Sequence, residues 1–245
     1  MLEELRCCSP VTDFSDTENK HTQDIFGDLN SQCHAEEWHL PRVGSIENPL
    51  RVCIMISGSG SGMEALLQHQ IENKCLHRTV LVISDRTEIS GLEKATGYGI
   101  KTIVVPLPKV KDRQLRRLEH ENLINKILHD NQVELIVLSG YMRILTPSFV
   151  RPWAGRVLNI HPSLLPEFPG ANAHGDVISA GVRKSGCTVH FVDSGMDTGP
   201  IISQAEVDVY PDDTVETLSD RVKLVEHKLY PEVIDAISSG DVQSP

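Results

Sequence analysis

The sequence predicts one α/β domain with three layers, in which helices cover both faces of a mostly parallel sheet and a smaller antiparallel part lies near the C-terminus. From Arg51 onward, apolar runs of strand length alternate with helical patterns. The runs are continuously rich in Val, Ile and Leu, which is typical of strands buried on both faces of a sheet. After residue 185 the alternation ends, and two strand patterns separated by a short turn-rich segment predict an antiparallel pair.

Five apolar runs predict the parallel part of the sheet. They are RVCIMIS (51–57), TVLVIS (79–84), KTIVVP (101–106), VELIVLSG (133–140) and RVLNI (156–160). Helical patterns between them indicate right-handed crossovers, which keep successive strands parallel. The antiparallel strands are predicted at GCTVHFVD (186–193) and PIISQAEVDV (200–209).

Three longer segments have the apolar spacing of helices. They are residues 62–73, 112–131 and 214–240. In the second helix the expected core-facing stripe consists of Leu115, Leu118, Leu123, Ile127 and Leu128. In the third helix Thr214 is a candidate N-cap, and Glu216 and Glu226 are expected on the polar side.

Composition limits the classes of partner. A chain of 245 residues that is 40% hydrophobic can form one α/β domain with a sizeable core. The formal net charge of -11 disfavours a nucleic acid or an anionic membrane as a general partner, because either requires a basic surface. No apolar run approaches the roughly 20 residues of a membrane helix, and the first residues lack the pattern of a signal peptide. We therefore expect a cytoplasmic protein.

The first 50 residues differ in composition from the remainder. They are polar and have no sustained apolar period, so we expect a poorly ordered extension (1–50) before the domain (51–240) and a short tail (241–245). Deleting the extension up to about Asn48 is expected to leave folding and activity nearly intact.

The cysteines are expected to be reduced thiols. The six of them are irregularly spread, which argues against a disulfide framework. No metal site is predicted, because no zinc-binding spacing is matched by the cysteines and histidines near the N-terminus, namely Cys7, Cys8, His21, Cys33, His34 and His39.

Two polar residues interrupt the apolar pattern at the end of a strand, in VLNIHPSLLPEFPG (157–170). Asn159 and His161 are two residues apart, so their side chains project from the same face of the strand. Pro162 cannot continue the hydrogen-bond ladder, so the strand ends there. Polar groups at the carboxyl end of such a strand are a common ligand site. The alternative is structural, with His161 bonded to a loop carbonyl and Asn159 serving as a turn residue.

A glycine-rich turn connects the first predicted strand to the first helix, in SGSGSGMEALL. Glycines allow a close approach of the backbone to an anion, and the free N–H groups of a helix start supply donors. The turn is therefore a candidate phosphate site. A tight turn without a ligand remains the alternative, because neither the dinucleotide fingerprint nor the Walker lysine is matched.

A second glycine-rich segment, VDSGMDTGP (192–200), supplies a carboxylate. If Asp197 lies beside His161, it raises the pKa of the imidazole and stabilises its charged form. An imidazolium and an Asn amide are both donors, and together they suit the oxyanion of a tetrahedral intermediate in acyl transfer. The alternative is that Asp193 and Asp197 only build a turn.

Several motifs resemble the phosphoribosylglycinamide formyltransferase family. They are NIHPSLLPEFPG, GCTVHFVDSGMDTGPII, RVKLVEHKLYP, GLEKATGYGIKT and GYMRIL, and they occur in the family's order between about residues 51 and 240. The resemblance implies a Rossmann-like formyltransferase fold. It also implies transfer of a formyl group from 10-formyltetrahydrofolate to the amine of glycinamide ribonucleotide in de novo purine synthesis, by an enzyme that is a monomer or a homodimer. The implied catalytic residues are Asn159, His161 and Asp197.

The resemblance also implies binding roles. The residues implied to bind the ribonucleotide are Gly60, Ser61, Gly62, Lys223 and Glu226. The residues implied to bind the folate are Arg113, Met142, Arg143, Ile144, Leu145, Val192 and Asp193. The alternative is that Met142, Ile144 and Leu145 are core residues and that Lys223 lies on a solvated helix face. The chain departs from the family at Gly62, where Asn is usual, and at Gly175, where a larger polar residue is common.

Other activities remain to be separated. Formyltetrahydrofolate deformylase shares the Asn, His and Asp but passes the formyl group to water, and it reads His-His-Ser where this chain has His161, Pro162 and Ser163. Methionyl-tRNA formyltransferase needs a basic surface for RNA, which the net charge of -11 disfavours. A non-catalytic folate or nucleotide binder would not need the three polar residues.

Overall fold

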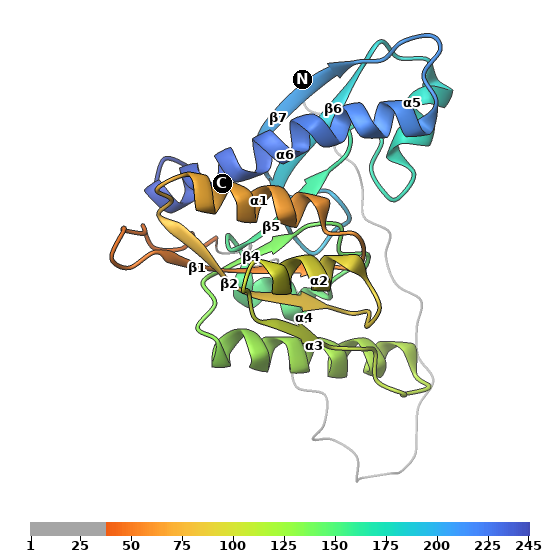
Figure 1. Ribbon diagram of the computed structural model, residues 1–245. Coiled ribbons are helices and arrows are strands. Elements are labelled where there is room, and N and C mark those ends of the chain that lie inside the picture. The colour runs from red at the N-terminus through yellow and green to blue at the C-terminus, as the bar shows by residue number, and fades with distance from the viewer. Residues whose placement is uncertain (1–37) are drawn as a thin grey trace, which may run out of the picture. The chain divides into compact units, whose positions relative to one another are not determined.

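A seven-stranded sheet organises the computed structural model, which describes residues 38–245 (Figure 1). The strand order is β3-β2-β1-β4-β5-β6-β7. The strands are β1 (Leu50–Ile56), β2 (His77–Ser84), β3 (Thr102–Val104), β4 (Leu135–Leu138), β5 (Val157–His161), β6 (Lys184–Phe191) and β7 (Ile201–Asp208). Strands β1 to β5 pair in parallel, whereas β6 is antiparallel to both β5 and β7. The predicted fold class is confirmed.

Helices form the two outer layers (Figure 1). They are α1 (Ser61–Glu72), α2 (Ser90–Gly97), α3 (Arg113–Asp130), α4 (Pro147–Val150), the 3-10 helix η1 (Arg151–Trp153), α5 (Ala173–Ala180) and α6 (Val215–Ser239). One hydrophobic cluster joins the sheet to α1, α2, α5 and α6, and a second joins the other face to α3, α4 and η1. Among the described residues, no helix is both long and apolar enough to cross a bilayer.

Strand β1 shows why the central runs are continuously apolar. Val52 and Ile54 belong to one cluster, and Cys53 and Met55 to the other. Successive side chains of a strand point to opposite faces, and here both faces are covered by helices. The burial on both sides that the sequence predicts is therefore present.

The predicted stripe of α3 is partly wrong. Leu115 and Leu123 are 54% and 50% exposed, while the buried residues are His120, Glu121, Ile124 and Leu128. The polar members have local partners, since His120 Nε2 donates to the carbonyl of Val105 over 2.7 Å and Glu121 accepts from the backbone N–H of Thr146 over 2.8 Å. Hydrophobicity alone did not indicate these polar contacts.

The short helices α2, α4 and α5 and the 3-10 helix were not predicted. Helices α2 and α5 have eight residues each, and α4 has four. Such segments offer too few turns for a clear apolar period. The long helix α6 begins as expected, because the Thr214 side chain accepts the backbone N–H of Thr217.

Residues 38–49 contact the domain, although they lie in the segment that composition assigned to the extension. The amide N–H of Gly44 donates to the carbonyl of Ser238 over 2.8 Å. The guanidinium of Arg42 holds the carboxylate of Glu134 through bonds of 2.6 and 2.9 Å. Trp38 packs on Phe191 with ring centroids 5.7 Å apart. Residues 1–50 are polar on average, so their composition did not indicate that residues 38–49 pack on the domain. The predicted disorder before it, and the cysteines at 7, 8 and 33, lie outside the described residues.

Two truncations separate these contacts from the preceding chain. Deleting residues 1–37 keeps every contact described above, whereas deleting residues 1–48 removes the packing of Trp38 and the ion pair of Arg42. We expect the longer deletion to cost about 2–3 kcal/mol and to lower the Tm by roughly 5–10 °C relative to the shorter one. Thermal unfolding of the two proteins measures the difference. Equal Tm values would mean that residues 38–48 add nothing to stability.

Candidate active site

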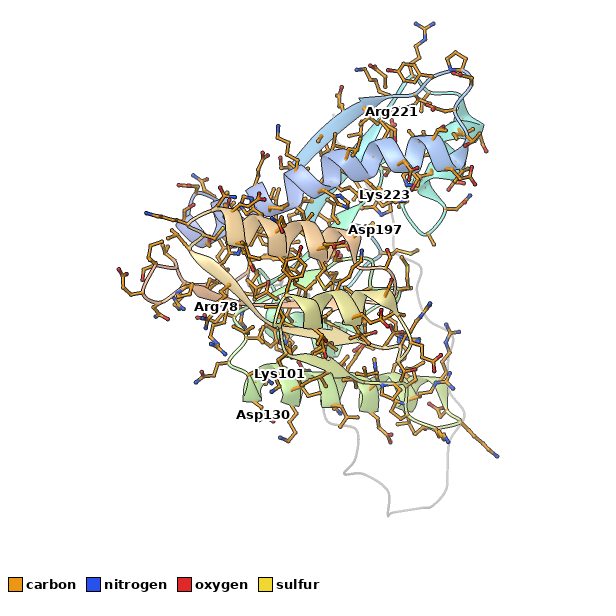
Figure 2. All side chains as sticks on the ribbon, viewed as in Figure 1. Arg78, Lys101, Asp130, Asp197, Arg221 and Lys223 are labelled. Atoms are coloured by element: carbon orange, nitrogen blue, oxygen red, sulfur yellow. The ribbon has the colours of Figure 1, made fainter. Side chains whose placement is uncertain are left out.

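The three catalytic candidates meet at the junction of β5 with the segment that follows β6. Asn159 and His161 lie on β5, and β6 pairs antiparallel with that strand. The loop between β6 and β7 begins beside Val157 and Leu158, at the amino end of β5, and carries Asp197 (labelled in Figure 2) to the side chain of His161. His161 Nδ1 lies 3.4 Å from Asp197 Oδ2, which is an ion-pair distance.

The orientation of His161 follows from its second ring nitrogen. His161 Nε2 donates to the carbonyl of Phe168 over 2.9 Å, and the hydroxyl of Ser163 donates to the same carbonyl over 3.1 Å. The hydrogen bond from His161 to a loop carbonyl, which the structural alternative predicted, is therefore also present. It leaves Nδ1 directed at Asp197, so both ring nitrogens face oxygen acceptors.

A further histidine, which sequence analysis did not single out, orients Asn159. His190 is the cross-strand partner of Asn159 in the register of β5 and β6. Its Nδ1–H donates to the carbonyl of Phe191 over 2.8 Å, so its Nε2 accepts from Asn159 Nδ2 over 3.2 Å. Burial lowers the pKa of His190, in keeping with this neutral form. The other amide hydrogen of Asn159 has no partner among residues 38–245 and can donate to a ligand.

Asp197 is held in position by its backbone and by a neighbouring loop. Its φ is 57°, in the left-handed region that Asp tolerates better than most residues. Its Oδ2 accepts the amide N–H of Gly170 over 2.9 Å, and the side chain is only 14% exposed. Asp193, in contrast, turns back on its own loop and accepts from Gly195 and Thr198. The turn role therefore fits the Asp193 side chain, and Asp197 faces His161.

These residues line a cavity of about 470 Å³. Its wall contains every catalytic and folate-binding candidate except Arg113, namely Asn159, His161, Asp197, Met142, Arg143, Ile144, Leu145, Val192 and Asp193. Met142 and Ile144 are 68% and 61% exposed, so they are not core residues, whereas Leu145 is buried. Exposed apolar side chains beside convergent polar groups are typical of a small-molecule site.

The loop between β4 and α4 that carries Met142 to Leu145 is anchored by a buried carboxylate. Asp85 at the end of β2 accepts from the Ser57 hydroxyl over 2.6 Å and from Arg143 Nε over 2.7 Å. Ser57 Oγ in turn accepts the amide N–H of Met142 over 2.9 Å. Sequence analysis missed Asp85 and Ser57. Their only signal was a polar residue at the end of each of two neighbouring parallel strands.

Arg113 lies on an adjoining cavity. This second cavity, of about 240 Å³, shares the residues 141–145 with the first and is flanked by Arg113, Arg116 and Arg117 of α3. The structure thus brings Arg113 near the loop of the other folate candidates without placing it in their cavity.

The candidate phosphate turn has the expected strand–turn–helix context. Gly60 has a φ of 67° and precedes α1, whose first turn contains Ser61 and Gly62. A Cβ on Gly62 would lie 2.7 Å from Ser139 Oγ, so in this chain Ser139 occupies the space next to that position. A Cβ on Gly175 would lie 2.7 Å from the Asn172 side chain, which fills that space in turn.

Lys223 and Glu226 lie on α6 and do not line the main cavity (Figure 2). Lys223 Nζ is 3.1 Å from Asp220 in an exposed pair. Glu226 is not on the solvated side as predicted but is half-buried, and this burial raises its pKa to about 7 while Lys223 opposes the rise. Burial, and after it the charge of Lys223, lowers the pKa of His174, whose Nδ1 is buried without a partner among the described residues. The charge of Lys223 thus acts on both Glu226 and His174.

Glu226 should make stability depend on pH. Its folded pKa of about 7 exceeds the ordinary 4.5, so the folded protein retains a proton that the unfolded chain releases. The free energy of unfolding therefore falls as the pH rises from 4.5 to 7, by up to about 3 kcal/mol from this group. We measure the free energy of unfolding in urea at pH 5 and pH 7.5. The difference between the two values should be smaller in Glu226→Gln than in the unaltered chain. Glu216→Gln, at an exposed position of the same helix, is the control, and it should leave the pH dependence of the free energy of unfolding unchanged.

Comparison with known proteins identifies the family. The profile of the family described as formyl transferase matches residues 50–234. A phosphoribosylglycinamide formyltransferase of Bacillus subtilis is 38% identical over 184 residues, which cover 75% of this chain and 92% of that protein. The chain belongs to the phosphoribosylglycinamide formyltransferase family. The predicted resemblance is confirmed.

Two more proteins are similar to this member of the phosphoribosylglycinamide formyltransferase family. The crystal structure of phosphoribosylglycinamide formyltransferase from Brucella melitensis has a TM-score of 0.73 and 42% identity, and the match covers 81% of this chain and 100% of that one. The trifunctional purine biosynthetic protein adenosine-3 of Bos taurus is 46% identical over 193 residues. That match covers 79% of this chain but 19% of the bovine protein, so the chain spans about a fifth of such multifunctional relatives.

Proposed function

We propose that this chain transfers the formyl group of 10-formyltetrahydrofolate to the amine of glycinamide ribonucleotide, a step of purine synthesis. The observation that carries the proposal is the convergence of Asn159, His161 and Asp197 on one cavity. The family supplies the identity of the two substrates, and the described site supplies groups suited to the chemistry.

The proposed roles follow from where charge develops. Attack of the uncharged amine on the formyl carbon places negative charge on the formyl oxygen. The proposed donors are the second amide hydrogen of Asn159 and the Nδ1–H of His161, since Nε2 of His161 is bonded to Phe168. The Nδ1–H lies 3.4 Å from Asp197 and is shared between that carboxylate and the formyl oxygen. Asp197 stabilises the imidazolium and, through a water, helps to move a proton from the attacking amine to the departing folate nitrogen.

The cavity wall supports a folate as the donor. The exposed side chains of Met142 and Ile144 offer apolar contact to a flat ring system. The backbone near Val192 and Asp193 offers polar groups to its pterin, and Arg113 offers positive charge for its carboxylates. We assign the phosphate of the ribonucleotide to the turn Gly60–Gly62, aided by Lys223, and the rest of that substrate to Glu226. The proposed reaction needs no metal.

An acceptor assay tests the proposal. The purified full chain is incubated with 10-formyltetrahydrofolate carrying labelled formyl, together with glycinamide ribonucleotide, with buffer alone, or with initiator methionyl-tRNA. We expect label in the ribonucleotide, at a rate far above the release of labelled formate. Equal formate release with and without the ribonucleotide would indicate a deformylase. Label in tRNA, or no turnover despite folate binding, would equally contradict the proposal.

Lys223→Ala tests the assignment of the phosphate. We expect the KM for the ribonucleotide to rise roughly tenfold or more, because a charge-assisted contact to phosphate is lost, while the KM for the folate changes little. Lys228→Ala, at an exposed position of the same helix, is the matched control for loss of a positive charge. An equal rise of both KM values in Lys223→Ala would move the phosphate to another position.

A further inference from the structure

A second cluster of chemically reactive side chains lies at the other end of the domain. Helix α1 starts at the proposed phosphate turn and ends near the start of β2, and the last turns of α6 pack beside it (Figure 1). There the ligand atoms of His69, Cys75 and Asp235 all lie within 4.8 Å of one another. The three residues come from α1, from the connection to β2 and from α6.

The carboxylate of Asp235 is held through one of its oxygens. The Gln70 Oε1 accepts the amide N–H of Thr79 over 3.1 Å, so Gln70 Nε2 donates to His77 Nδ1 over 2.7 Å. His77 Nε2 therefore carries the hydrogen and donates to Asp235 Oδ1 over 2.9 Å. The His77 side chain is 0% exposed, so this support is rigid.

The other carboxylate oxygen faces the remaining two residues. Asp235 Oδ2 lies 2.7 Å from His69 Nε2, and the Cys75 thiol, whose sulfur lies within 4.8 Å of both ligand atoms, donates to the backbone carbonyl of His69 over 3.9 Å. The side chains of His69 and Asp235 are 23% and 40% exposed, so an ion can enter from solvent. Among the described cysteines, Cys53 and Cys187 are buried and only Cys75 is partly accessible.

We propose that His69, Cys75 and Asp235 form a zinc-class metal site, with His77 orienting the carboxylate. One imidazole, one thiolate and one carboxylate are ligands that Zn²⁺ accepts, and a water can complete a tetrahedron. Ligand atoms around such an ion are about 3.3–3.8 Å apart, so the contact between His69 and Asp235 must open by less than about 1 Å. Binding releases the thiol proton to solvent and moves the His69 proton from Nε2 to Nδ1, so the Asn73 amide that now donates to Nδ1 must turn away. The charge of the ion balances the thiolate and the carboxylate.

Such an ion would connect the ends of α1 and α6 that lie away from the proposed substrate site. His77 donating to the carboxylate is the kind of outer partner that fixes metal ligands elsewhere. The expected role is therefore structural, and the site does not depend on the proposed formyl transfer.

Titration of the full chain with Co²⁺, a spectroscopic probe for zinc sites, tests the proposal. We expect one tightly bound Co²⁺ with a thiolate-to-metal charge-transfer band. Cys75→Ser should abolish that band, and both Cys75→Ser and His69→Gln should weaken binding at least tenfold. The triple variant Cys7→Ser/Cys8→Ser/Cys33→Ser is the matched control, and it should retain the band. Zn²⁺ should raise the Tm of the unaltered chain by several degrees but not that of Cys75→Ser.

Two results would overturn the proposal. A band that persists in Cys75→Ser and disappears in the triple variant would assign the metal to the N-terminal cysteines. Absence of any thiolate band in the unaltered chain would leave the cluster as a hydrogen-bonded connection between α1, β2 and α6.

Discussion

His161→Ala is expected to lower kcat roughly a hundredfold or more while folate binding survives. The imidazole is proposed to donate Nδ1–H to the oxygen that becomes negative during the reaction, and loss of one such donor typically costs a factor of about 10² to 10³ in kcat. Because this bond strengthens only in the transition state, the KM for the folate should change little. Steady-state rates with both substrates saturating give the value.

The fold of this variant needs a control, since His161 is only 4% exposed and bonds the loop at Phe168. Ser163→Ala removes another donor to the same carbonyl without touching the imidazole. It should share any loosening of the loop but retain most of kcat. A near-normal kcat in His161→Ala would reduce His161 to a structural residue and overturn its proposed role.

Asp197→Asn is expected to have an effect of similar size by a different route. The amide oxygen can still accept the N–H of Gly170, and Asn tolerates the left-handed backbone, so the loop should keep its conformation. The negative charge beside His161 is lost, and with it the stabilisation of the imidazolium and the proton relay. We expect kcat to fall roughly a hundredfold or more, with little change in the folate dissociation constant.

Asp213→Asn is the matched control for the loss of a carboxylate in a loop. Asp213 pairs with Arg221 over 2.7 Å at the start of α6 and does not line the cavity. It should lower the Tm and leave kcat close to that of the unaltered chain. If Asp197→Asn instead raises the folate KM and spares kcat, Asp197 is a binding residue rather than a participant in the chemistry.

Local patterns in the sequence were sufficient to predict the strands of the sheet. Each predicted strand is present, and in the central strands continuous burial leaves a direct record in the residues, as in Val52 to Met55 of β1. Asn159 and His161 were recognisable as a pair because they share one strand. The glycine-rich segment 192–200 offered Asp197 as a partner for His161, and the family resemblance then implied its catalytic role.

Contacts that depend on strand register or on distant segments are not indicated by any local pattern in the sequence. His190 orients Asn159 only because β6 pairs with β5 in one particular register. Asp85 anchors the loop at Met142 through a contact between neighbouring strand ends. Trp38 belongs to a segment whose average composition is polar, although its ring packs on Phe191. Each of these needs tertiary structure before it can be predicted.

A double-mutant cycle on Asn159 and His161 tests most directly whether the two side chains act together on one oxyanion. Single-turnover rates are measured for the unaltered chain, Asn159→Ala, His161→Ala and the double variant, with both substrates saturating. We predict that each single variant loses roughly a hundredfold or more and that the double variant loses clearly less than the product of the two losses. A double variant whose loss equals the product would mean that the two side chains act independently, which would contradict a shared oxyanion site.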